Sequence, residues 1–240
     1  MYHWLVPGEQ AECNRRAVQS GRARCYTVRD MIEQDWLCLE ILKTRGWESR
    51  DRDDDVLDSP VRFVAFVRKQ GLLASSEARL LRSAAAGADS AWFESLVDRV
   101  REMRELLRRM FARVADGQSP DAADLEALEG FLAASAQRFA LATDADRGIS
   151  WQWDDRGRAP LTSVTPEDLG PAATARIVGA IARSAADLLT CGDVERVKVC
   201  DAHDCGWFFV DVSRNKSRRW CDMAGCGNRD KARRYRERHG

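Results

Sequence analysis

Four cysteines near the C-terminal end constrain the fold of this chain more than any other feature. Cys200, Cys205, Cys221 and Cys226 follow the spacing C-x4-C-x15-C-x4-C. Two close cysteine pairs that lie roughly 15 to 20 residues apart are typical of a tetrahedral zinc site, because each pair closes a tight turn and the intervening chain brings the turns together. We therefore predict one structural Zn²⁺ ion held by these four sulfurs.

Two histidines near the cysteines are the alternative ligands. His203 lies inside the first cysteine turn and His239 ends the tail, and mixed cysteine and histidine sites are common for zinc. We favour four sulfurs, because two matched pairs need no further ligand and His239 lies about three helical turns beyond Cys226. Four protein ligands leave no open position for water or substrate, so we expect a structural ion and not a catalytic one.

The composition is that of an ordinary globular protein with one large domain and one small module. Of the 240 residues, 45% are hydrophobic and 32% are charged, which suffices for one sizeable core. No apolar run approaches the roughly 18 residues of a membrane span, and the start lacks a secretory signal. We expect a cytoplasmic protein without membrane contact, in which Cys13, Cys25, Cys38 and Cys191 are free thiols.

The charge of the chain is unevenly distributed. The totals of 38 basic and 38 acidic residues cancel, but residues 211–240 contain ten Lys and Arg against four Asp and Glu, a net charge of +6. The remainder of the chain therefore has a net charge of −6. Four thiolates with one Zn²⁺ would change the tail from +6 to +4, so it stays basic when the metal is bound. Such asymmetry indicates a polyanionic partner for the end of the chain.

Hydrophobic periodicity predicts a mainly α (α+β) fold. Residues 36–42 form a short apolar run for which we favour a helix, with a buried strand as the alternative, and residues 60–71 form a helix between a cap at Ser59 and a stop at Gly71, with a strand as the alternative. Further helices are predicted at 76–86, 92–115, 121–137, 166–190 and 227–238. A β-hairpin is predicted at 139–142 and 149–153, and short strands at 196–200 and 207–211.

These elements group into three predicted segments. We expect residues 1–30 to be peripheral or poorly ordered, because their arginines are spread among Gly, Ser and Cys without a period. Residues 31–192 form the α-rich domain and residues 193–240 the zinc module. The sequence contains no internal repeat.

The last predicted helix is the candidate nucleic-acid contact. About twelve residues make a rod of ~18 Å, which can lie in a DNA major groove ~12 Å wide. Asn228 and Arg229 are residue types that read adenine and guanine edges. Further basic residues are candidates for phosphate contacts: Lys231, Arg233, Arg234, Arg236, Arg218 and Arg219. The alternative is a solvated charged helix without a partner.

Aromatic residues form two groups whose role the sequence leaves open. Trp207, Phe208, Phe209 and Trp220 surround the cysteines; we interpret them as packing around the zinc site, with a base-stacking surface as the alternative. Trp151 and Trp153 alternate along a predicted strand, which favours one core-facing side, although their indoles could also line a pocket for a small-molecule ligand.

An enzymatic function has little support in the sequence. The chain has three histidines, no Gly-rich phosphate loop and no G-x-S-x-G turn. The acidic run at 51–55 lacks the glycine and the final glutamate of a calcium loop, so we interpret it as a solvated loop. We predict that the protein is not an enzyme. A homodimer would suit a regulator of palindromic sites, but no heptad repeat indicates one.

The segment at 218–236 reads R-R-W-C-D-M-A-G-C-G-N-R-D-K-A-R-R-Y-R. It closely resembles the signature of the bacterial CGNR zinc finger, which is named after the tetrapeptide that Cys226, Gly227, Asn228 and Arg229 form here. The segment C-D-A-H-D-C-G-W-F-F-V-D-V-S-R-N-K-S at 200–217 is similar to the first cysteine turn and strand of that family. Such proteins generally have an α-rich N-terminal ABATE domain, which W-L-C-L-E-I-L at 36–42 and P-V-R-F-V-A-F-V-R-K-Q-G-L at 60–72 resemble. The resemblance departs at residues 1–30 and at Glu40, where an aspartate is expected.

The resemblance implies a stress-related transcriptional regulator. Its zinc module would be treble-clef-like and would bind DNA, and its α-rich domain would sense a ligand or form a dimer. Taken with the basic tail, it leads to the hypothesis of a DNA-binding regulator. The alternative is a zinc-stabilised module that binds RNA or another protein, because similar cysteine scaffolds serve those uses too.

Overall fold

The computed structural model describes residues 36–45, 54–87, 91–135, 139–144, 148–153, 161–163, 165–190 and 194–239. Within them the chain is mainly helical with two small antiparallel sheets, which confirms the predicted fold class. The prediction for residues 1–30 lies outside the described residues. In the described part, no helix combines the length and the apolar character that a membrane span requires.

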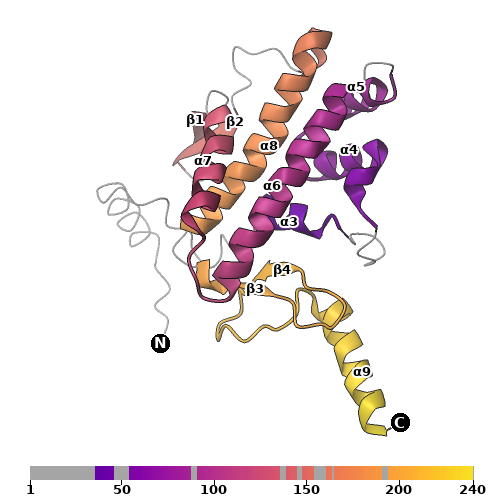
Figure 1. The fold of residues 1–240 in the computed structure, drawn as a ribbon, viewed down its shortest axis with the longest axis vertical. Helices are drawn as coiled ribbons and strands as arrows, with labels where there is room; N and C mark the ends of the chain where they lie inside the picture. Colours follow the sequence, from indigo (N-terminus) through magenta and orange to yellow (C-terminus); the bar gives the residue numbers. More distant parts are fainter. Residues whose placement is uncertain are drawn as a thin grey trace, which may run out of the picture.

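Among the described residues, the helical body contains six α-helices and two short 3₁₀ turns before the zinc module. In chain order these elements are α3 (Leu37–Lys43), η1 (Val56–Asp58), α4 (Pro60–Lys69), α5 (Ser75–Ala85), α6 (Ala91–Ala115), α7 (Ala122–Ser135), η3 (Leu161–Ser163) and α8 (Pro166–Thr190). Figure 1 shows α6 and α8 side by side through the middle of the molecule, with α3, α4 and α5 on one side and α7 on the other.

Local capping signals set several of the helix boundaries. The hydroxyl of Ser59 accepts a hydrogen bond from the amide of Arg62, and Pro60 occupies the first helical position of α4. Gly71 follows this helix with φ of +75°, a left-handed conformation that glycine adopts without the steric clash of a Cβ atom. Both ends of the predicted helix are therefore confirmed, and the alternative of a strand at 60–71 is wrong.

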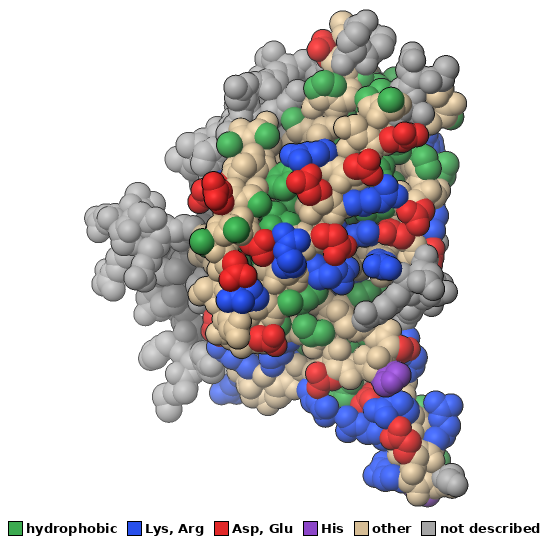
Figure 2. Space-filling model, viewed as in Figure 1, with side chains coloured by type: hydrophobic (Ala, Val, Ile, Leu, Met, Phe, Trp, Pro, Cys, Tyr) green, Lys and Arg blue, Asp and Glu red, His purple; other side chains and the backbone are tan. Residues whose placement is uncertain are grey.

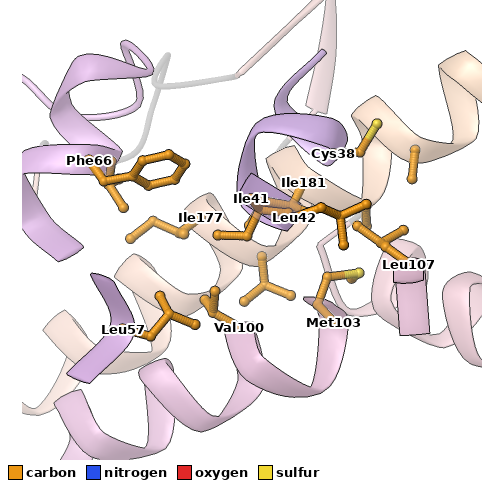
Figure 3. Close-up of a cluster of buried hydrophobic side chains, with 14 of the residues drawn as sticks. Cys38, Ile41, Leu42, Leu57, Phe66, Val100, Met103, Leu107, Ile177 and Ile181 are labelled. Carbon is orange, nitrogen blue, oxygen red and sulfur yellow. The ribbon is translucent and has the colours of Figure 1, made fainter. Parts of the chain in front are cut away.

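The hydrophobic core lies between α3, α6 and α8. Ile41 and Leu42 of α3, Met103 of α6 and Ile181 of α8 belong to one buried cluster, which Figure 3 shows in close-up. Ile41 and Met103 are fully buried, and Ile181 is 1% exposed. The seven-residue α3 is too short to be stable alone, so this packing stabilises it. The favoured helix at 36–42 is therefore confirmed, and the alternative of a buried strand is wrong.

Two buried ion pairs connect elements that are distant in sequence. The guanidinium of Arg104 in α6 donates two hydrogen bonds to Asp55, at 2.8 and 2.6 Å, and a third to Thr44. Arg176 of α8 donates to Glu77 of α5 at 2.8 Å. The interpretation of residues 51–55 as a solvated loop is wrong for Asp55, whose side chain is 12% exposed, because Arg104 attracts it into the body.

Two β-hairpins complete the fold. β1 (Phe139–Asp144) pairs with β2 (Gly148–Trp153) as predicted, with Leu141 opposite Trp151 and Phe139 opposite Trp153. The side chains of these tryptophans lie outside the described residues, so the core-facing side stays a prediction and the pocket its alternative. The second hairpin, β3 (Val197–Val199) and β4 (Phe208–Val210), follows η4 (Val194–Arg196) and begins the zinc module.

The β3–β4 hairpin joins the zinc module to the helical core. Val197, Phe208 and Val210 belong to the same buried hydrophobic cluster as α3, α6 and α8. The ring of Phe208 lies 6.4 Å from that of Phe111 in α6, measured between centroids. The division of the chain at residue 193 stays a prediction, and the strands that follow it are packed against the helices that precede it.

Candidate metal centre and basic helix

The four cysteines are positioned by two turns that meet at one point of the module. The first turn, Cys200 to Cys205, follows β3 and is closed by the amide of Cys200, which donates to the carbonyl of Trp207 at 2.8 Å. The second turn precedes α9 (Asn228–His239) and includes η5 (Met223–Gly227). We call the turn at 200–205 the first knuckle and the turn at 221–226 the second knuckle. The first knuckle, the β3–β4 hairpin and the helix that begins beside Cys226 form the treble-clef-like arrangement that the resemblance implies.

The sulfur atoms have the spacing of a tetrahedral metal site. All four Sγ atoms lie within 4.8 Å of one another, and the Cys205–Cys221 and Cys221–Cys226 separations are 3.7 and 3.6 Å. Zn–S bonds of about 2.3 Å require sulfur separations of about 3.8 Å in a tetrahedron. The four cysteines can therefore hold one zinc ion, as the spacing in the sequence predicts.

No histidine belongs to this cluster among the described residues. His203 is exposed in the first turn, and His239 is at the far end of α9, where its ring stacks on Tyr235. Both alternatives to a four-sulfur site therefore lose their support.

Hydrogen bonds from the protein surround the sulfurs. The amide of Cys221 donates to Sγ of Cys200 at 3.4 Å. Nη2 of Arg229 donates to Sγ of Cys226 at 3.5 Å and to the carboxylate of Asp204 at 2.9 Å. Such outer contacts orient metal ligands and tune their basicity. Arg229 thus connects the helix side of the site with the first knuckle.

Crowding of the thiols shifts their pKa values in opposite directions. The hydrogen bond with Cys221 lowers the pKa of Cys205 to about 5, and the same contact raises the pKa of Cys221. Burial raises the pKa of Cys226 to about 11. Zinc binds the thiolate, so we expect metal binding to release protons from these cysteines.

The aromatic residues divide between two cores. Trp207, Phe209 and Trp220 pack against the cysteines, as predicted. The prediction is wrong for Phe208, which belongs to the helical core, because neighbouring residues of a strand point to opposite faces. All three residues of β4 are buried, so this strand has the zinc site on one face and α6 on the other.

A buried carboxylate organises the connection between β4 and the second knuckle. Asp211 is fully buried and accepts from Nζ of Lys198 at 2.6 Å, from the amide of Ser213 at 2.9 Å and from the amide of Arg218 at 2.9 Å. Burial opposes its ionisation, but these hydrogen bonds outweigh burial and lower its pKa. The carboxylate of Asp211 thereby holds the two ends of the loop at 211–218 together.

The helical segment begins earlier than the sequence predicts. Asp222 caps it by accepting from the amides of Ala224 and Gly225, at 3.2 and 2.6 Å, and η5 is a π-helical turn that continues into α9. Asn228 and Arg229 consequently lie in the second turn, and the amide of Asn228 is already bonded to carbonyls of η5. A Cβ atom on Gly227 would lie 2.7 Å from Sδ of Met223, an exposed side chain that would have to move.

The residues predicted to contact DNA fall into two groups. Five of them bind other parts of the module: Arg218 donates to the carbonyls of Trp220 and Cys221, Arg219 pairs with Asp201, Arg229 with Asp204, Arg233 with Asp230 and Glu237, and Arg234 with Asp230. The side chains of Asn228, Lys231 and Arg236 are exposed and have no polar partner among the described residues. Helical spacing could have indicated the pairs of Arg233 and Arg234, whose acidic partners lie three or four residues away. The sequence could not show the pairs of Arg219 and Arg229, whose partners lie 18 and 25 residues away.

Comparisons with known families agree with this geometry. A family model described as "CGNR zinc finger" matches residues 196–239. A second model, ABATE, described as "Putative stress-induced transcription regulator", matches residues 35–192. No match to the chain is found among curated proteins. Both matched families are of the regulator and zinc-finger type and neither is enzymatic. The chain therefore belongs to the ABATE family and has a CGNR zinc finger at its C-terminal side.

Proposed function

We propose that this protein is a DNA-binding transcriptional regulator whose structural zinc ion positions the basic helix α9 on the duplex. The observation that supports this most directly is the position of α9. Figure 1 shows the helix running away from the helical body, and Figure 2 shows Lys and Arg side chains gathered over that end, whereas acidic and basic side chains are mixed over the body.

The charge and the dimensions of α9 suit a duplex. Its twelve residues make a rod of ~18 Å, and a major groove is ~12 Å wide. The matched family descriptions, a zinc finger and a transcription regulator, are consistent with this function. We further propose that the ABATE domain is the sensing or dimerisation unit.

A zinc-stabilised module for RNA or protein is the alternative function. The indoles of Trp207 and Trp220 would be needed to stack on unpaired bases. Both pack against the cysteine cluster, and Trp220 also lies under the guanidinium of Arg219 at 5.3 Å. Packing therefore accounts for the two rings, and we favour duplex DNA.

A binding selection tests the proposed function. The zinc-loaded full chain is mixed with genomic fragments, and retained duplexes are measured by electrophoretic mobility across a salt series. If about five phosphates are neutralised, the logarithm of affinity should fall against the logarithm of salt concentration with a slope of about −4.5. Chelation of zinc should abolish the shift. Absence of a shift at low salt, or a preference for structured RNA, would contradict the proposal.

A further inference from the structure

Ion pairs divide α9 into two faces of different electrostatic character. Both acidic residues of the helix, Asp230 and Glu237, lie on one face, where Arg233 contacts them at 2.9 and 2.5 Å and Arg234 contacts Asp230 at 2.9 Å. The side chain of Asp230 is only 2% exposed, so this face is buried at its N-terminal end, whereas the side chain of Glu237 is 57% exposed. Its two arginines are largely neutralised by the acids beside them.

The opposite face is exposed and contains no acidic residue. Helical positions i, i+3, i+4 and i+7 share one side at 3.6 residues per turn. On this face of α9 they are occupied by Asn228, Lys231, Ala232 and Tyr235. All four are exposed. His239 follows at i+11 on the same side. We call these residues, 228, 231, 232, 235 and 239, the open face of α9.

Tyr235 is the unexpected member of the open face. It is 60% exposed, although a tyrosine ring generally buries much of its area in a core or an interface. Its ring stacks on that of His239, with centroids 4.2 Å apart and planes 19° from parallel. The stacking restrains the ring on a surface that packs against no other part of the described chain.

We propose that the open face of α9 enters the major groove, and that Arg229 and Arg233 support the helix without reading bases. The inference deepens the proposed function and depends on it. Asn228 and Lys231 have the donors that read adenine and guanine edges, and Ala232 and the ring of Tyr235 provide apolar contacts for a thymine methyl group. Arg236, exposed at the margin of this face, reaches a phosphate.

Charge complementarity favours duplex DNA as the occupant. Lys231 and Arg236 have no polar partner among the described residues, so binding phosphates breaks no existing ion pair. Presenting the other face would place Asp230 and Glu237 next to the phosphates and would require Arg233 to leave both of them. Duplex DNA therefore binds the open face of α9, which contains no Asp or Glu.

Matched variants on the two faces test the inference. The affinity of the full, zinc-loaded chain is measured by fluorescence anisotropy on a labelled duplex that the wild type selects from genomic fragments. Lys231→Ala and Arg233→Ala remove the same charge from opposite faces, so their long-range electrostatic effects are similar. We expect Lys231→Ala to weaken binding about 5- to 100-fold, and clearly more than Arg233→Ala does.

Neutral variants separate readout from charge. Asn228→Ala and Tyr235→Ala should each weaken binding about tenfold without changing the salt slope, whereas the double variant Arg233→Gln with Glu237→Gln, which keeps the net charge, should bind as the wild type does. Thermal melting of each variant confirms that the module is folded. Equal losses on the two faces, or wild-type affinity of both neutral open-face variants, would overturn the inference and leave the proposed function intact. Failure of the wild type to bind any duplex would overturn both.

Discussion

At the scale of single residues, Arg229 has a contact that its type does not indicate. Its type predicts a contact with guanine, which stays a prediction, and in the folded module its side chain bridges Cys226 and Asp204. The sequence could not show this, because Asp204 approaches the helix only after both cysteine turns have folded. By contrast, the four cysteines were predictable, since the spacing within each pair is local and zinc accepts few other arrangements.

The bridging role of Arg229 predicts that its loss weakens zinc retention. Arg229→Ala removes the donor to Sγ of Cys226, and Asp204→Ala removes the carboxylate that orients the same guanidinium. Changes to such outer contacts typically reduce metal affinity about 10- to 100-fold. Competition with a chromophoric chelator measures the effect.

Arg234→Ala is the matched control, because Arg234 lies on the same helix and pairs with Asp230, whereas Arg229 pairs with Asp204. It should retain zinc as the wild type does. If Arg229→Ala and Asp204→Ala released zinc no faster than this control, Arg229 would have no part in holding the site.

At the scale of helices and strands, local signals predicted well and distant partners did not. Ser59, Pro60 and Gly71 define α4 through contacts within a few residues, so the sequence shows them directly. Asp55 and Arg104, which form an ion pair, lie 49 residues apart in the sequence. Phe208 and its contact Phe111 in α6 lie nearly a hundred residues apart. Neither leaves a periodic signal, so the sequence alone favours a solvated loop for the acidic run and a position beside the zinc site for Phe208.

The loop around Asp211 should make the stability of the module depend on pH. Because the pKa of Asp211 is lower in the folded protein than its ordinary value of 3.8, the ionised form stabilises the fold. This contribution is complete above pH 3.8 and is lost as the pH falls below that value. At neutral pH we expect Asp211→Asn to reduce the free energy of unfolding by about 1–3 kcal/mol.

Urea unfolding followed by tryptophan fluorescence, at a series of pH values, measures this contribution. The difference in free energy of unfolding between the wild type and Asp211→Asn should shrink as the pH falls below 3.8. A constant difference across the acid range would mean that Asp211 does not stabilise the fold through its charge.

At the scale of the whole molecule, the zinc site and the helical body share strand β4. Phe209 packs against the cysteines, and Phe208 and Val210 pack in the helical core. Neighbouring residues of one buried strand therefore contact both the metal site and the helical core, so we expect order in one to stabilise the other. The cysteine spacing and the helical periodicity are separate patterns in the sequence, and the contact between the two regions depends on tertiary packing that no local pattern encodes.

This arrangement predicts that zinc stabilises the helical body as well as the module. Because ligands that bind only the folded state raise stability, we expect chelation to lower the midpoint of thermal unfolding monitored at 222 nm, where α-helices dominate the circular dichroism signal. Calorimetry with and without the chelator tests the coupling. Two independent transitions, with the larger one unaffected by chelation, would contradict it.

The two-sided burial of β4 also limits how the parts of this protein can be exchanged. A helical domain expressed without the strand would expose the ring of Phe111 and its neighbours, and a zinc module fused to a foreign domain would expose Phe208 and Val210. Each fragment would then present an apolar patch that favours aggregation. Chimeras built from this chain should therefore exchange the exposed residues of α9 and keep the remainder, from α3 to the second knuckle, as one piece.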